Sequence, residues 1–423
     1  MMEKVDIMVD SASETHSSLF ACLDLQDFLP CSMARISHPS GSLNYANAII
    51  ESMSLVKVDG RLLLFHPWMN LKRMREGAST IGIKMDAFPD EKIIGNVFAL
   101  AAINGFHKSL WHGKTVLRAG KKINKFYIRQ LLYFESEGLG ASPANGPGLL
   151  STISPIGEHL QQDKRKGIKV MLFPFPRKLQ FPCVCTSSTY QLQQHSKNKM
   201  ALFNEEHGES CREVIFQNPS GEVIGANGEN IVILKNGKLI SPLASDGAIP
   251  GITLQMVFHL AKDMGLEFTE GKITLKDICQ ADAFFLTGEP AGIVPVSEIL
   301  EVNSNFKLKE THSILSAGNN ILRKLKGQYS RMEIGEGMFR QLHYEMQDWL
   351  SFKEAERIYS CGLRFKERMA RAWRKGLEHL SRHRPNPHIM NPSWGSIQAG
   401  SKFSEFFDNY GKGSGYDGNK ERC

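Results

Sequence analysis

The chain of 423 residues lacks any apolar run that approaches the roughly 20 residues of a membrane-spanning helix. Its first residues, MMEKVDIMVDSASETHSS, are polar and acidic. They have neither the apolar core of a secretory signal nor the arginine-rich composition of a mitochondrial transit peptide. We therefore expect an intracellular protein without a transmembrane segment, with the cytoplasm favoured over an organelle.

Cysteine is scarce and shows no metal-binding or redox spacing. Of the eight cysteines, only Cys183 and Cys185 are close together. The single residue between them is shorter than the two-residue spacer of zinc and redox motifs. We expect free thiols in a reducing compartment and no metal site.

The body of the chain has little net charge. The formal charge is +7, but residues 352–384 contain ten Lys or Arg and four Glu, so most of the excess lies in one C-terminal segment. The near-neutral remainder gives no reason to expect a nucleic-acid partner.

Within that segment the apolar residues follow helical spacing, which predicts one apolar face on a basic helix. They are Phe365, Met369, Trp373, Leu377 and Leu380, and the basic residues between them are Arg364, Lys366, Arg368, Arg371, Arg374 and Lys375. The favoured interpretation is a terminal helix that packs on its own protein. The alternative is a helix that binds an acidic protein partner.

What the chain does contain indicates a mixed α/β protein of two domains, since 423 residues exceed one usual core. The predicted parts are a partly disordered or loosely docked leader (1–32), a small α/β domain (33–157), a linker (158–167), a larger domain (168–335), a basic helical extension (336–384) and a disordered tail (385–423). Hairpin turns are predicted at Asp59-Gly60 and at Asn236-Gly237. Helices are predicted over 69–83, 92–106 and 250–265, and a strand over 124–136.

Four segments carry a family resemblance when they are taken in order. LLLFHPWMNLKRM (62–74) resembles the pattern LFRPxxNxxRM, and LNYANAIIESM (43–53) resembles LHYxxxxFEGM. Tyr127-Ile128-Arg129 and the block 223–299 complete the set. Together they resemble the class IV (fold type IV) pyridoxal-phosphate aminotransferases, the branched-chain amino acid aminotransferases in particular. The resemblance implies a two-domain fold, a homodimer and pyridoxal phosphate as cofactor.

The resemblance also assigns positions to the cofactor chemistry. Pyridoxal phosphate needs a lysine amine for its Schiff base. The register fixed by Tyr190 puts Cys185 at that position, and an ungapped count puts Gln191 there; neither side chain forms a Schiff base. Lys197 and Lys199 are the remaining candidate amines, and we expect both in a solvated loop.

The other cofactor positions are replaced as well. The acid that pairs with the pyridine nitrogen corresponds to Gly225, and the phosphate-binding arginine corresponds to His66. Glu289 lies in the loop that resembles a second phosphate contact, where a carboxylate repels phosphate. Gly251, Ile252 and Thr253, at a predicted helix N-terminus, keep the potential to bind an anion.

On the substrate side, Tyr45, Tyr127 and Arg129 match positions that line the amino-acid pocket of the family. They are equally consistent with core packing. If they bind a ligand, we expect a small carboxylate or an amino acid.

The main hypothesis is a branched-chain aminotransferase-like protein with impaired or lost transamination, acting as a binding or regulatory protein or as the dimer partner of an active relative. Two alternatives stay open. One is an active enzyme that moves an amino group between branched-chain amino acids and 2-oxoglutarate with an unrecognised lysine. The other is an interaction protein that acts through the basic C-terminal helix.

Overall fold

The computed structural model describes residues 20–34, 36, 40–108, 115–134, 146–157, 167–178, 184–289, 291–314, 316, 319–351, 353–365 and 371. The chain divides into two compact units, residues 1–355 and 356–423. In the second unit the described residues 356–365 are helical. Most of the predicted basic helix and the whole predicted tail lie outside the described residues. None of the helices in the described ranges is both long and apolar enough to cross a bilayer.

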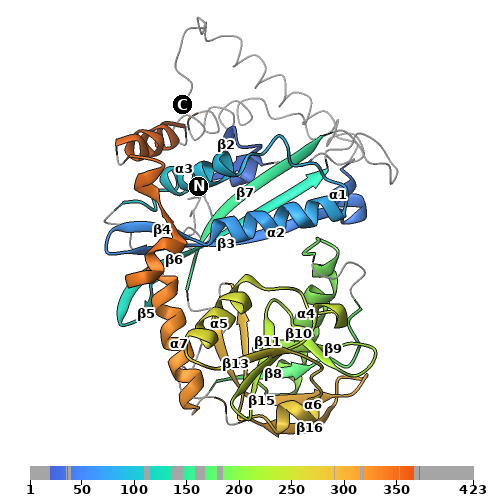
Figure 1. Ribbon diagram of the computed structural model, residues 1–423. Coiled ribbons are helices and arrows are strands. Elements are labelled where there is room, and N and C mark those ends of the chain that lie inside the picture. Colours follow the sequence, from blue (N-terminus) through green and yellow to red (C-terminus); the bar gives the residue numbers. More distant parts are fainter. Residues whose placement is uncertain are drawn as a thin grey trace, which may run out of the picture. The chain divides into compact units, whose positions relative to one another are not determined.

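The first sheet of the larger unit is antiparallel, with the strand order β17-β4-β3-β6-β7-β1-β2 and with β5 paired to β6 (Figure 1). Its strands are β1 (Phe20–Leu23), β2 (Asp27–Pro30), β3 (Ala48–Val58), β4 (Arg61–Phe65), β5 (Thr115–Arg118), β6 (Lys121–Phe134), β7 (Pro147–Ile156) and β17 (His343–Glu345). The helical elements that precede, connect and follow these strands are η1 (Cys31–Met33), α1 (Gly41–Tyr45), α2 (Pro67–Thr80), α3 (Asp90–Ile103), η4 (Gly337–Leu342) and η5 (Met346–Asp348).

The second sheet is mixed, with the order β10-β9-β8-β15-β14-β11-β12-β13 and with β16 paired to β15. Its strands are β8 (Ile168–Leu172), β9 (Glu213–Gln217), β10 (Val223–Ala226), β11 (Asn230–Lys235), β12 (Lys238–Ser241), β13 (Glu267–Glu270), β14 (Ala283–Gly288), β15 (Gly292–Val302) and β16 (Leu308–Ser313). The helical elements of this region are α4 (Thr189–His207), η2 (Ala244–Asp246), α5 (Ile252–Asp263), α6 (Leu275–Cys279) and α7 (Asn320–Glu333).

Both faces of the second sheet are buried. On β14, Phe284 belongs to an apolar cluster with residues of β8 and β15, whereas its neighbour Phe285 packs with residues of α5 and α7. Successive side chains of a strand point to opposite faces, so a run of consecutive apolar residues indicates a sheet covered on both sides. The mixed α/β fold is as predicted.

Several predicted elements are confirmed. Asp59 and Gly60, with φ of 49° and 78°, form the two-residue turn between β3 and β4. This is the geometry of the primed turns that suit hairpins. Asn236 and Gly237 connect β11 to β12 in the same way. Helices α2, α3 and α5 overlap the ranges predicted for them.

Two expectations about local structure were wrong. Lys197 and Lys199 lie in helix α4 and not in a loop. Its buried residues Gln193, Ser196, Met200 and Phe203 follow helical spacing, but two of the four are polar and weaken the periodic signal. Residues 337–348, predicted as part of a continuous helix, instead form short 3₁₀ turns around β17, which joins the first sheet.

Candidate functional site

A cavity of about 580 Å³ lies where β3 and β6 of the first sheet approach the start of α4, the strands β10 and β11, and the N-terminus of α5. Ten of the residues singled out from the sequence line it. They are Tyr127, Arg129, Cys185, Tyr190, Lys197, Gly225, Gly251, Ile252, Thr253 and Glu289. The cavity volume is within the roughly 300–1,000 Å³ typical of small-molecule sites.

His66 is the main residue that the structure separates from the cavity. It is 1% exposed and packs against Phe65 and Trp68, with ring centroids 4.5 and 5.6 Å apart. Burial, together with the neighbouring His343, lowers the pKa of His66 to about 4, so the imidazole is neutral at physiological pH. Neither ring nitrogen has a hydrogen-bond partner among the described residues. His66 is therefore not placed to bind an anion in this cavity.

Three other predicted residues also lie outside the cavity lining. Tyr45, at the end of α1, is 49% exposed. Gln191 is exposed on α4, and the Lys199 Nζ lies 5.4 Å from the centroid of the Phe306 ring. Of the candidate amines, only Lys197 reaches the cavity.

Cys185 is held in the cavity wall by backbone pairing with β3. Its carbonyl oxygen accepts a hydrogen bond of 2.9 Å from the Ile50 N–H, and the Ser187 N–H donates to the Ala48 carbonyl at 2.9 Å. Thr186 forms a bridge with Ile49 between these contacts. Burial raises the pKa of the Cys185 thiol, so it is uncharged at neutral pH.

Lys197 lines the cavity but is already engaged. Its Nζ lies 2.9 Å from Oε2 of Glu213 and donates to the Arg212 carbonyl at 2.9 Å. Burial, and then the nearby Glu213, raise the pKa of Glu229 well above its ordinary value. Lys197 is the single lysine among the described lining residues, and its charge is balanced by Glu213.

Two charged residues of the first sheet and α2 form a pair at the cavity that the sequence did not reveal. Arg73 donates to both carboxylate oxygens of Glu51, with distances of 2.9 Å from Nε and 2.6 Å from Nη2. Glu51 is 2% exposed and also accepts a hydrogen bond from the Asn70 amide at 3.2 Å. The two-bond geometry fixes the Arg73 side chain and neutralises its charge.

Arg177 was also missed, because it lies in a proline-rich segment after β8 without any motif. It is 5% exposed, yet no carboxylate of the described residues pairs with its guanidinium. Nη1 donates to the Ala226 carbonyl at 3.0 Å, and the guanidinium carbon lies 5.0 Å from the Phe216 ring centroid. Burial lowers the pKa of Arg177 to about 10, so it still carries its charge at neutral pH.

Gly225 leaves the space that the Arg177 guanidinium occupies. A Cβ added at Gly225 meets Nη2 of Arg177 at 2.8 Å. The position that the sequence assigned to an acid is therefore taken by an arginine side chain from another segment.

Arg129, on β6, is the second guanidinium in the cavity without an acidic partner in the described part of the chain. It is exposed, and its Cζ lies 5.2 Å above the centroid of the Tyr190 ring. Tyr190 is the second residue of α4 and follows Cys185 by five positions. The tyrosine ring and the arginine thus form one wall of the cavity.

The N-terminus of α5 also lines the cavity. Gly251 is its N-cap, and a Cβ at this position meets Oδ1 of Asn230 at 1.9 Å, so only glycine fits without rearrangement. The first N–H groups of a helix have no partner within the helix and favour an anion. Glu289 lies in the same wall, and burial raises its pKa to about 7, against the lowering effect of Lys125.

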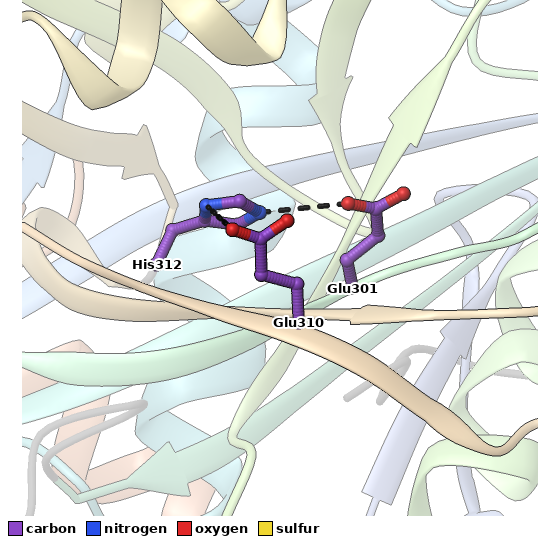
Figure 2. Close-up of side chains that lie close together, drawn as sticks. All are labelled: Glu301, Glu310 and His312. Carbon is purple, nitrogen blue, oxygen red and sulfur yellow. Dashed lines mark ion pairs between the residues drawn. The ribbon is translucent and has the colours of Figure 1, made fainter.

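A separate polar cluster lies on β15 and β16, shown in Figure 2. His312 contacts Glu301 and Glu310, with nitrogen–oxygen distances of 3.5 and 3.8 Å, and the ligand atoms of the three residues lie within 4.8 Å of one another. Lys309 also pairs with Glu301 at 2.5 Å, and this hydrogen bond lowers the pKa of Glu301. A lysine that already neutralises the central carboxylate opposes cation binding, so we interpret the cluster as ion pairing between two strands.

The comparisons with known proteins agree with the fold. The sequence profile of the family "Amino-transferase class IV" matches residues 48–299, more than half of the chain. The branched-chain-amino-acid aminotransferase of Salmonella typhimurium is 23% identical over 271 residues, which cover 63% of this chain and 80% of that protein. A putative branched-chain-amino-acid aminotransferase of Methanocaldococcus jannaschii is 42% identical over 87 residues, 21% of this chain and 30% of that protein.

Among solved structures, the branched-chain aminotransferase of Thermoproteus uzoniensis, determined with norvaline, superimposes with a TM-score of 0.63 at 22% identity. The superposition covers 78% of this chain and 99% of that chain. The similarity thus extends over the two sheets that enclose the cavity, and the chain belongs to the class IV aminotransferase family.

Proposed function

We propose that this protein binds a small carboxylate or an amino acid in its cavity and does not carry out pyridoxal-phosphate transamination. Enzymes of the class IV family depend on pyridoxal phosphate, which supplies the electron sink for amino-group transfer. The proposal rests on how poorly the cavity residues suit that cofactor and how well they suit an anion.

The first misfit is the lysine. Cys185 occupies the position that the resemblance assigns to the Schiff-base amine, and a thiol does not form an imine. Lys197 is the single described lysine in the wall, and its ammonium is engaged by Glu213 and by a backbone carbonyl. Freeing it for chemistry leaves the Glu213 carboxylate, 2% exposed, without its cation.

The second misfit is the charge at the two ends of the cofactor. A protonated pyridine nitrogen needs an acid beside it, and the assigned position, Gly225, has the Arg177 guanidinium instead. A phosphate needs cations or N–H donors, whereas Glu289 places a carboxyl group in that wall and His66 is buried elsewhere. We therefore derive no reaction step through pyridoxal phosphate for this chain.

The observation that carries carboxylate binding is the pair of guanidiniums without acidic partners. Arg73 and Lys197 are balanced by Glu51 and Glu213, but Arg129 and Arg177 have no balancing carboxylate in the described part of the chain. Arg177 is buried, and a buried cation is costly unless an anion accompanies it, whereas Arg129 is exposed and accessible to a ligand. Guanidinium groups bind carboxylates through two parallel hydrogen bonds, so a small carboxylate suits this wall.

Isothermal titration calorimetry with 4-methylpentanoate and with leucine tests the proposal. We expect binding to the wild-type chain and a loss of at least about tenfold in affinity in Arg129→Gln/Arg177→Gln, since a hydrogen bond to a charged group contributes about 1.5–3 kcal/mol. Arg75→Gln is the matched control, because Arg75 pairs with Asp90 outside the cavity lining. Absence of binding to the wild-type chain, or equal binding to the double variant, contradicts the proposal.

One observation supports the alternative of an active enzyme, namely that Lys197 lines the cavity. In that case Lys197 would be the residue that holds the cofactor, and it would have to leave Glu213 to do so. The homodimer, the partnership with an active relative and the intracellular location stay predictions, and light scattering of the purified chain tests the first of them.

A further inference from the structure

The strongest unexplained feature of the cavity is a buried cation that no side chain of the described residues neutralises. Arg177 donates from Nη1 to the Ala226 carbonyl, while its Nη2 lies 3.5 Å from the Gly247 carbonyl. These carbonyls and the Phe216 ring hold the guanidinium in one orientation. They satisfy hydrogen bonds but contribute no full negative charge. The Nε–H of Arg177 has no hydrogen-bond partner among the described residues. An ordered guanidinium that lacks a counter-ion can bind an anionic group.

The missing side chain at Gly225 makes room on the cavity side of this guanidinium. Gly225 and Arg177 both line the cavity, and Nη2 lies 2.8 Å from the Cβ that any other residue at position 225 would carry. An acid built into the chain at this position would neutralise Arg177 internally. The chain instead leaves that charge open to a ligand.

The remaining charges of the cavity favour an anion with two charges. Burial raises the pKa of Cys185, of Glu229 and of Glu289, the last to about 7, and Arg73 and Lys197 are paired. Arg129 and Arg177 are the two cations without a carboxylate partner among the described lining residues, and Glu289 carries part of a negative charge at neutral pH. A ligand with one carboxylate satisfies one of them, and a ligand with two satisfies both.

We propose, on the basis of the carboxylate-binding function above, that Arg177 seats a second anionic group and that the cavity therefore selects a small dicarboxylate over a branched aliphatic monocarboxylate. One carboxylate of the ligand lies on Arg177 beside Gly225, and the other lies on Arg129 beside Tyr190. Arg177 is then the residue that sets the specificity of the cavity.

Succinate and 4-methylpentanoate form a matched pair of probes, because the two acids have the same chain length up to the terminal group and differ in a carboxylate in place of an isopropyl group of similar size. We expect the wild-type chain to bind succinate about tenfold or more tightly than 4-methylpentanoate in calorimetry at one fixed low salt concentration, the effect of one charge-assisted contact. Arg177→Gln and Arg129→Gln each leave one of the two guanidinium groups. In each variant we expect the ratio of the succinate affinity to the 4-methylpentanoate affinity to fall toward one. In Arg75→Gln it stays at the wild-type value.

Replacement of the buried Arg177 can lower the stability of the fold. Arg129 is exposed, so Arg129→Gln provides a second variant for the same test. Equal affinity of the wild-type chain for the two probes, or a preference for succinate that survives Arg177→Gln, overturns the inference while carboxylate binding stands. Failure of both probes to bind overturns carboxylate binding as well.

Discussion

A Glu333→Gln substitution is expected to lower the free energy of unfolding by about 3–5 kcal/mol. Glu333 ends helix α7, and its fully buried carboxylate forms ion pairs with Lys125 of β6 and with Arg118 of β5. Glutamine keeps the shape of the side chain but removes its charge. Two buried cations then face a neutral amide, and the contact between α7 and the first sheet loses its counter-ion. Urea unfolding at neutral pH measures the difference.

The same substitution in an exposed pair is the control. Glu267 pairs with Lys238 at 2.8 Å, and both side chains are about half exposed, so Glu267→Gln should cost less than about 1 kcal/mol. A loss below 1 kcal/mol in Glu333→Gln would show that the buried pairs contribute little.

The stability difference should also depend on pH. Burial alone raises the pKa of Glu333, but Lys125 and Arg118 outweigh it and hold the pKa at about 2, below the ordinary 4.5. The contribution of Glu333 is therefore fully present above pH 4.5 and is lost as the pH falls toward 2. The difference in the free energy of unfolding between the wild type and Glu333→Gln should become smaller as the pH falls from 4.5 toward 2.

Arg73→Gln is expected to cost a similar amount, about 3–5 kcal/mol, because it leaves the buried Glu51 carboxylate without its cation. Glu51 then keeps the Asn70 amide and the Ser52 N–H as hydrogen-bond donors, which do not supply a positive charge. Because the pair borders the cavity, the variant should also weaken ligand binding. Thermal and urea unfolding measure the stability effect.

Arg75→Gln is a close control for this second prediction. Arg75 lies two residues further along α2, and its pair with Asp90 is 36% and 43% exposed, so its loss should cost less than about 1 kcal/mol. If the two variants are equally stable, the Arg73–Glu51 pair does not hold the cavity wall together.

Much of the fold could be predicted from the sequence, because the relevant signals are local. Asp59-Gly60 and Asn236-Gly237 suit the positive φ of their turns, and the apolar spacing of α5 matches its buried face. Helix α4 was not predicted from the sequence, because its buried face includes the polar residues Gln193 and Ser196. Ser196 contacts the Asn227 amide oxygen at 3.2 Å.

Contacts around the cavity between segments that are distant in the sequence could not be predicted from local patterns. Cys185, Gly225 and Tyr190, which the resemblance assigned to cofactor positions, all line the cavity. The resemblance gave no indication that Arg177, 48 positions before Gly225 in the numbering, fills the space beside that glycine. That contact depends on how β8, β10 and the following loops pack, and no spacing rule within one segment reports it. For the same reason His66 matched a motif while its side chain points away from the cavity lining.

We propose that this aminotransferase fold does not hold pyridoxal phosphate on a lysine. The direct test is to incubate the purified chain with pyridoxal phosphate, record the absorbance spectrum, reduce with borohydride and map the modified peptides. We predict the spectrum of free cofactor and no stoichiometric pyridoxyl group in the α4 peptide that contains Lys197. A Schiff-base absorbance band, with one pyridoxyl group per chain trapped on Lys197, would contradict the account and show that the chain retains the chemistry of its family.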